Sequence, residues 1–290
     1  MSRATASSNG DPVLIFVQTR GEARAADYGF LGVEPDEPWW RSYREYTSFE
    51  LPTLLLHSSG QAWRAWLSGI RSARRDAVGT TVRFTVVLQG DCADNEAQAV
   101  TLVLLHRWLA DVTTGTRCVG TALDEAFPGP DVERLLTCGA EQDDAEIRRR
   151  TLDALRALPA SGTAPELGTW EEPDEREELP ERWIGRLGAP HLPAALLRRS
   201  AELLSGVPGR ALVLNLIDSR AEADALVEDD TALAILVDDD GNGGLGETAE
   251  ELHPKKAPAP APEAARPTRR RSTLTQWLVQ VWWQMRRWLG

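Results

Sequence analysis

Cysteine is scarce in this sequence, and its positions argue against two classes of small, cross-linked domain. The three cysteines, Cys92, Cys118 and Cys138, are far apart, and none belongs to a CxxC pair. A disulfide framework needs an even set of cysteines, and a structural zinc site usually takes its ligands from closely spaced pairs. We therefore expect neither, and the cysteine content is typical of a protein kept in a reducing cytoplasm.

Long apolar segments and specific enzyme motifs are missing as well. No run of about 18 apolar residues could cross a membrane, and residues 1–12 lack the apolar core of a secretory signal peptide. The sequence contains no glycine-rich phosphate loop, no HExxH and no GxSxG. These absences argue against a transmembrane span and against the enzyme classes that those motifs define.

The chain has enough apolar residues for a substantial core, and its charge is distributed unevenly. Of the 290 residues, 42% are hydrophobic and 26% are charged, which is the balance of a globular protein. The net charge is −12, but residues 253–290 carry eight Lys or Arg against one acid, which leaves −19 for residues 1–252. The acidic part repels nucleic acid, so we do not expect nucleic acid as the main partner.

Apolar runs alternate with helical patterns along the chain, and this alternation predicts an α/β fold. Strands are expected at residues 12–17, 51–57, 80–88, 210–217 and 231–237. Helices are expected at residues 61–75, 95–110, 131–137, 144–158, 193–204 and 220–228, and a weaker signal predicts a strand at 117–122. We expect mixed or mainly parallel sheet layers with flanking helices, including a β-α-β unit over residues 210–237.

Two proline-rich segments divide the chain into five predicted regions. Residues 159–182 contain four prolines, and seven carboxylates lie within residues 171–181, so this segment cannot bury enough apolar area to order itself. A second, Pro/Ala-rich segment precedes the C-terminus. The predicted regions are an N-terminal α/β domain, an acidic linker or insertion, a second β-α-β subdomain, a Pro/Ala/Arg linker and an amphipathic helix, at residues 1–158, 159–182, 183–252, 253–272 and 273–290.

Residues 28–49 form an aromatic-rich stretch without a clear strand or helix period. It includes the adjacent pair Trp39 and Trp40. We interpret it as a long loop whose tryptophans cover the core, and the alternative is an aromatic patch that binds a ligand.

An acidic loop near the end of the second predicted subdomain resembles the calcium-binding loop of EF-hand proteins. Asp238, Asp240 and Asn242 match the first, third and fifth oxygen ligands of that loop. The twelfth position holds Ala249 in place of the bidentate glutamate. Three interpretations stay open, namely a calcium site, a magnesium site that joins Asp218 to Asp238 at the ends of neighbouring strands, and a solvated acidic turn without a cofactor.

His57 and Cys92 are the candidates for a catalytic pair. His57 ends one predicted strand, and Cys92 follows the next core strand, 35 residues later. This order is similar to that of caspase-like peptidases, in which an imidazole activates a cysteine thiolate. The resemblance implies a cysteine hydrolase, and the alternative is a structural cysteine beside an unrelated loop histidine.

The C-terminal segment is the most distinctive part of the sequence. On a helical wheel, most apolar side chains of residues 273–289 fall in one arc of about 140°, and the glutamines and arginines fall outside it. The basic cluster Arg269, Arg270 and Arg271 leads into this segment. We therefore predict an amphipathic helix whose apolar face includes Trp277, Leu278, Val281, Trp282, Met285 and Trp288.

This predicted helix supports several functions, which the sequence leaves open. It can lie in the headgroup region of an anionic membrane, dock in the groove of a partner protein, or pack on its own domain. We expect a non-catalytic cytoplasmic adaptor or regulatory protein that uses residues 273–290 to reach a membrane surface or a partner. The alternatives are a cysteine hydrolase that uses His57 and Cys92, a metal-dependent enzyme that uses the acidic loop, and a membrane-perturbing effector.

Overall fold

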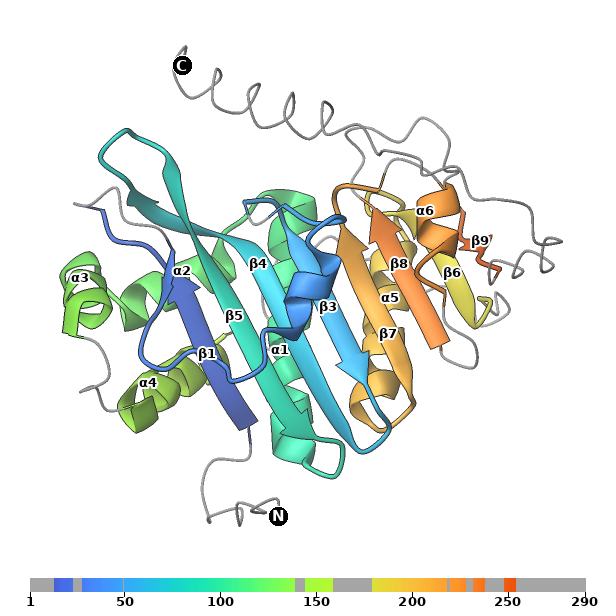
Figure 1. Cartoon of the computed structure of the whole chain (residues 1–290), viewed down its shortest axis with the longest axis horizontal. Helices are drawn as coiled ribbons and strands as arrows, with labels where there is room; N and C mark the ends of the chain where they lie inside the picture. Colours follow the sequence, from blue (N-terminus) through green and yellow to red (C-terminus); the bar gives the residue numbers. More distant parts are fainter. Residues whose placement is uncertain are drawn as a thin grey trace, which may run out of the picture. The chain divides into compact units, whose positions relative to one another are not determined.

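A computed structural model of the 290-residue chain describes residues 13–22, 28–48, 50–138, 144–158, 179–217, 220–227, 232–237 and 248–253. These residues form one nine-stranded sheet with helices packed against it (Figure 1). The strands are β1 Val13–Thr19, β2 Gly29–Phe30, β3 Thr53–Ser58, β4 Ala62–Arg75, β5 Thr81–Asp91, β6 Arg182–Arg186, β7 Gly209–Leu214, β8 Ala232–Val237 and β9 Glu250–Glu251. The helices are the 3-10 helix η1 Trp39–Tyr43 and the α-helices α1 Asn95–Thr114, α2 Cys118–Ala126, α3 Gly129–Cys138, α4 Asp144–Arg156, α5 Leu192–Leu204 and α6 Arg220–Asp224.

The sheet is mixed, which confirms the predicted α/β class with a mixed sheet and flanking helices. Its strand order is β2-β1-β5-β4-β3-β7-β8-β6-β9. Neighbours from β2 to β7 are antiparallel, β7, β8 and β6 are parallel, and β9 is antiparallel to β6. The predicted β-α-β unit is β7-α6-β8, and its two strands are parallel neighbours. Strands that precede the predicted linker and strands that follow it therefore share one sheet, in which β3 pairs with β7.

Four helices, α1, α2, α4 and α5, cover one face of the sheet, which we call the helix face (Figure 1). Leu88 of β5, Leu104 of α1 and Leu196 of α5 belong to the continuous apolar core on this side. Helix α1 is well delimited, because the carboxylate of Asp94 accepts hydrogen bonds from two backbone amides of its first turn and Gly115 ends it with φ 74°. No helix among the described residues has both the length and the hydropathy that a membrane crossing requires.

The opposite face, which we call the open face, carries a second and smaller core. It forms where η1 and α6 lie over β3, β7 and β8, and it includes Leu55, Leu212 and Leu226. Trp39 and Tyr43 of η1 are buried in it, with 6% and 5% of their surface exposed. This burial confirms the interpretation that the aromatic stretch covers the core.

The helix predicted at residues 61–75 is wrong, because these residues form the long central strand β4. Trp63, Trp66 and Ile70 have helical spacing, but β4 lies between β3 and β5 and is buried on both faces over most of its length. A short apolar run that is buried on both sides does not distinguish a strand from a helix by its period. The positive φ of Gly69, 70°, coincides with a break in register between Leu67 and Ile70, and the break lets β4 change which side chains face the helices.

The weak strand prediction at residues 117–122 is also wrong, because helix α2 begins at Cys118. Val119 and Leu123, four residues apart, are both buried against the helix-face core, as helical periodicity requires. Helix α2 approaches β4 closely at Gly120, where an added Cβ would lie 1.8 Å from the carbonyl oxygen of Arg71. The glycine thus serves tertiary packing, which local sequence patterns do not reveal.

Candidate functional site

A row of side chains crosses the open face of the sheet and joins five strands. The strand registers place Leu14 of β1 opposite Gln89 of β5, Gln89 opposite Arg64 of β4, and Arg64 opposite His57 of β3. His57 in turn lies opposite Arg210 of β7. Side chains at directly opposed positions share one face of a sheet, so these five residues form a single cross-strand row.

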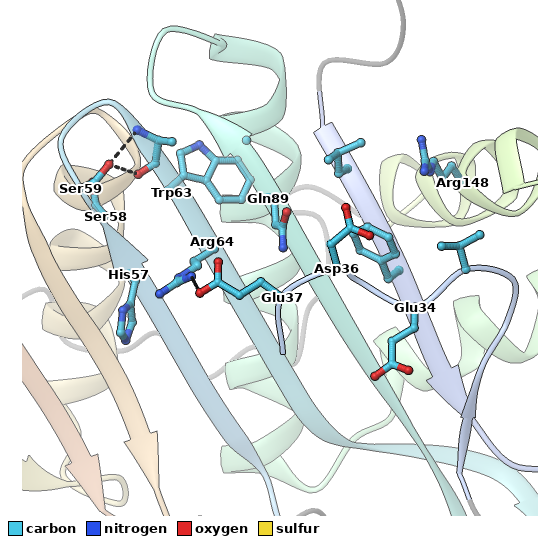
Figure 2. Close-up of a pocket in the computed structure, with 15 residues that line it drawn as sticks. Glu34, Asp36, Glu37, His57, Ser58, Ser59, Trp63, Arg64, Gln89 and Arg148 are labelled. Carbon is cyan, nitrogen blue, oxygen red and sulfur yellow. Dashed lines mark hydrogen bonds and ion pairs between the residues drawn. The ribbon is translucent and has the colours of Figure 1, made fainter. Parts of the chain in front are cut away.

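Part of this row lines a hollow of about 660 Å³ on the open face (Figure 2). The segment of residues 31–38 follows β2 at the edge beside β1 and leads to η1, which packs over β3. The hollow lies between this segment and the strands, and Arg148 of α4 contributes to its wall. We call it the sheet-face hollow, and its lining includes Leu14, Phe16, Val33, Asp36, Gln89 and Arg148.

Arg64 is held in place near the centre of the row. Its guanidinium lies 3.3 Å from a carboxylate oxygen of Glu37 (Figure 2). The same guanidinium lies 4.7 Å from the centre of the Trp39 ring. An arginine stacked on an aromatic face and paired with a carboxylate loses much of its freedom to move. Arg64 therefore links the segment of residues 31–38 to the sheet.

His57 is part of a hydrogen-bonded chain that keeps it neutral. The Tyr43 hydroxyl lies 2.7 Å from His57 Nε2, and Arg210 donates a hydrogen bond from Nη1 to the same hydroxyl at 3.3 Å. Since the hydroxyl has one proton, it donates that proton to Nε2 while it accepts from Arg210, and the imidazole proton then lies on Nδ1. Burial, together with the positive charges of Arg210 and Arg64, lowers the pKa of His57 to about 3.

Cys92 lies on the other side of the sheet from the His57 imidazole. Its Sγ is 3.8 Å from the hydroxyl of Ser58, and it packs against the helix-face core. Ser58 follows His57 in β3, and successive strand residues point to opposite faces. The structure therefore does not bring together the imidazole and the thiol of the predicted pair. A base with a pKa of about 3 is in addition too weak to deprotonate a thiol near neutral pH.

The other predicted site residues lie outside the described residues. This applies to the candidate metal ligands Asp218, Asp238, Asp240 and Asn242 and to the whole C-terminal segment with Arg269, Arg270, Arg271, Trp277, Leu278, Val281, Trp282, Met285 and Trp288. Among the residues that the structure does describe, no group of three or more His, Cys, Asp or Glu side chains is placed to hold a metal ion. The calcium and magnesium interpretations stay predictions.

Sequence reasoning named His57 but missed its neighbours in the row and in the hollow. Arg64 lies in the segment predicted to be helical, residues 61–75, and Gln89 lies just beyond the strand predicted at residues 80–88. Arg148 lies in α4, far from β1 in the chain, although its guanidinium is 5.8 Å from the centre of the Phe16 ring. A correct prediction of the strand registers would have placed the residues of the row opposite one another. A single sequence contains no direct signal for the contact of Arg148 with Phe16.

The hollow offers binding groups of several kinds. Carboxylates, guanidiniums, the Gln89 amide and apolar side chains all line it, and its volume lies within the range of small-ligand sites, about 300–1,000 Å³. This combination suits recognition by charge, hydrogen bonding and apolar contact.

Comparison of the chain with known protein families, with curated proteins and with solved structures finds no match.

Proposed function

We propose that this protein is a non-catalytic cytoplasmic adaptor that docks on an anionic membrane surface through residues 273–290. The observation that carries the proposal is the charge contrast, with −19 on residues 1–252 and eight Lys or Arg against one acid on residues 253–290. A basic, tryptophan-rich segment that is too short to span a bilayer is typical of an interfacial helix. The Pro/Ala spacer before it would let the segment reach a surface at some distance from the folded body.

The folded body supports a binding role more than a catalytic one. His57 donates no proton and accepts none near neutral pH, because its pKa is about 3 and its Nε2 already bonds to Tyr43. The Cys92 thiol is placed beside Ser58, on the helix face. We therefore favour an adaptor over the cysteine hydrolase that the chain order of the two residues implied.

Vesicle flotation tests the docking step. We expect the full chain to float with vesicles of phosphatidylcholine and phosphatidylserine, and a chain that lacks residues 268–290 to stay at the bottom of the gradient. Replacement of Arg269, Arg270 and Arg271 by glutamine should cost at most about 3 kcal/mol, or roughly two orders of magnitude in partitioning, since each charge near an anionic leaflet contributes about 1 kcal/mol. Equal flotation of the truncated and full chains would contradict the proposal.

The interfacial interpretation also depends on the tryptophans. Trp282→Ala combined with Trp288→Ala should weaken flotation, whereas Trp40→Ala, at a half-buried position of η1, serves as the matched control outside the segment. Vesicle leakage measured in the same samples distinguishes an anchor, which leaves the vesicles intact, from a membrane-perturbing effector.

A groove on a partner protein is the second candidate for the docking surface. It is favoured by Trp283, which falls outside the apolar arc of the predicted helix and makes the apolar face wide. In this case flotation fails, but a synthetic peptide of residues 268–290 competes with the full chain for the partner. The two docking surfaces thus give opposite results in the flotation assay.

A further inference from the structure

Apolar side chains are left uncovered inside the sheet-face hollow. Leu14 and Val33 expose 40% and 45% of their surfaces, and both line the hollow together with the half-buried Phe16. Leu14 and Phe16 come from β1, and Val33 comes from the segment that follows β2. When a ligand covers apolar surface in a concave site, that surface leaves water, and the free energy of binding becomes more favourable.

The charged groups around the hollow are paired, with two exceptions. Glu37 pairs with Arg64 at 3.3 Å, and Glu34 pairs with Arg41 at 3.5 Å. Asp36 is exposed and forms no ion pair with a described residue. Arg148 contacts the Phe16 ring, and it pairs with no carboxylate among the residues that the structure describes. Figure 2 shows Asp36 and Arg148 at separate places along the hollow. One anion and one cation therefore remain available to a ligand.

Backbone groups are available beside the same apolar residues. Val17 accepts a hydrogen bond from the Leu31 amide at 2.8 Å on the outer side of β1. Because the backbone groups of successive strand residues alternate in direction, Ile15 presents its N–H and C=O to that outer side as well. Strand β2 pairs only with Gln18 and Thr19, and no described strand continues along the edge beside Ile15.

The Gln89 amide adds a donor and an acceptor in the middle of the lining. Gln89 lies directly opposite Leu14 on one side and Arg64 on the other. A primary amide can donate to a peptide carbonyl and accept from a peptide N–H. The strand edge and Gln89 therefore both offer the hydrogen-bond donors and acceptors that an extended peptide backbone requires. The three carboxylates of residues 34–37 disfavour binding of polyphosphates and nucleic acid.

We propose that the sheet-face hollow binds a short, extended peptide segment that carries an acidic and a basic residue on either side of an apolar residue. The apolar side chain contacts Leu14, Phe16 and Val33. The acidic residue pairs with Arg148, and the basic residue pairs with Asp36. The backbone bonds to the edge of β1 at Ile15. The site contains none of residues 273–290, so this proposal does not depend on the membrane docking of those residues.

Selection from a random peptide library displayed on phage, with the full chain as bait, tests the proposal. We expect enrichment of sequences in which an apolar residue stands between an acid and a base. A synthetic peptide of the enriched sequence should lose at least about tenfold in affinity for the Arg148→Glu chain, because an attractive charge pair becomes repulsive. The Arg149→Glu chain is the matched control, since Arg149 is exposed on the same helix, pairs with Glu146 and Asp153, and does not line the hollow.

A charge swap separates recognition from misfolding. The Arg148→Glu chain should regain affinity for a peptide in which lysine replaces the acidic residue, and the Asp36→Lys chain should regain affinity for a peptide in which glutamate replaces the basic residue. A misfolded variant would bind neither peptide. The proposal is overturned if no sequence is enriched, if the enriched sequences lack the two charges, or if the exchanges at Arg148 and Asp36 leave the affinities unchanged.

Discussion

The two faces of the central strands consist of alternating residues of the same segments, yet their cover differs greatly. Toward the helices, side chains such as Leu88 are fully buried under a continuous layer of α1, α2, α4 and α5. On the open face, η1 and α6 cover the strands around β3, β7 and β8, whereas Leu14 and Gln89, on β1 and β5, line the sheet-face hollow. The helix face thus buries its side chains under helices, whereas part of the open face has polar side chains that line a hollow.

The largest effect is expected for a residue of β5 that points to the helix face. Leu88 is buried in the helix-face core with no exposed surface, so Leu88→Ala should lower the free energy of unfolding by about 2–5 kcal/mol through lost apolar contact and a residual cavity. Urea unfolding followed by circular dichroism measures this loss. A cost below about 1 kcal/mol would mean that the helix layer does not seal this face as described.

A smaller effect is expected where η1 seals the open face. Tyr43→Phe removes the hydroxyl that joins the buried Arg210 Nη1 to His57 Nε2, and loss of a partner by a buried polar group costs about 1–3 kcal/mol. Tyr46→Phe is the control, because Tyr46 belongs to the same segment and is half-buried. Equal stability losses for the two variants, measured by urea unfolding, would contradict a specific role for the Tyr43 hydroxyl.

The pH dependence of stability tests the state of His57. Its pKa falls from the ordinary value of 6.5 to about 3 in the folded protein, so between these values the unfolded chain binds a proton that the folded chain does not. Stability is therefore complete above about pH 6.5 and decreases as the pH falls toward 3, with a slope of up to about 1.4 kcal/mol per pH unit from this group. The His57→Gln chain should lack this contribution, and identical slopes in urea titrations from pH 7 to pH 5 would refute it.

The smallest effect on stability is expected in the sheet-face hollow. Gln89 neighbours Leu88 in β5 but points to the opposite face, where it lines the hollow. Gln89→Ala should change the free energy of unfolding by no more than about 0.5 kcal/mol, as is usual for substitutions outside a packed core. If Gln89→Ala destabilised the fold as much as Leu88→Ala, the two faces would not differ in the way proposed. The same variant should weaken peptide binding, measured by fluorescence anisotropy.

Much of the fold could be predicted because many elements have a clear local pattern. The strands around Leu212 and Ile235 are continuous apolar runs, and the strand around Val86 is rich in β-branched and apolar residues. The α1 helix has a capping aspartate and a terminal glycine. Strand β4 could not be identified by period, because it is buried on both faces and interrupted by a bulge. Helix α2 was not predicted, because a helix of nine residues shows only a short periodic pattern and because its position depends on packing against β4.

The site was less predictable than the fold, for a physical reason. His57 and Cys92 were singled out because both stand at the ends of apolar runs, but one step along a strand reverses the direction of a side chain, so chain order does not decide which groups meet. The contacts of Arg64 with Glu37 and of Arg148 with Phe16 depend on strand register and on how the segment of residues 31–38 is placed. These are tertiary features.

By itself, the sequence determined the α/β class, the acidic character of residues 1–252 and the basic, tryptophan-rich composition of the C-terminal segment, because composition and hydrophobic period are local properties. The tertiary structure alone decided that residues from β1, β5, β4 and β3 form one row, that His57 is held neutral by Tyr43 and Arg210, and that Cys92 belongs to the other face. The physical reason is that strand register and helix packing, which bring distant residues together, are set by burial across the whole sheet.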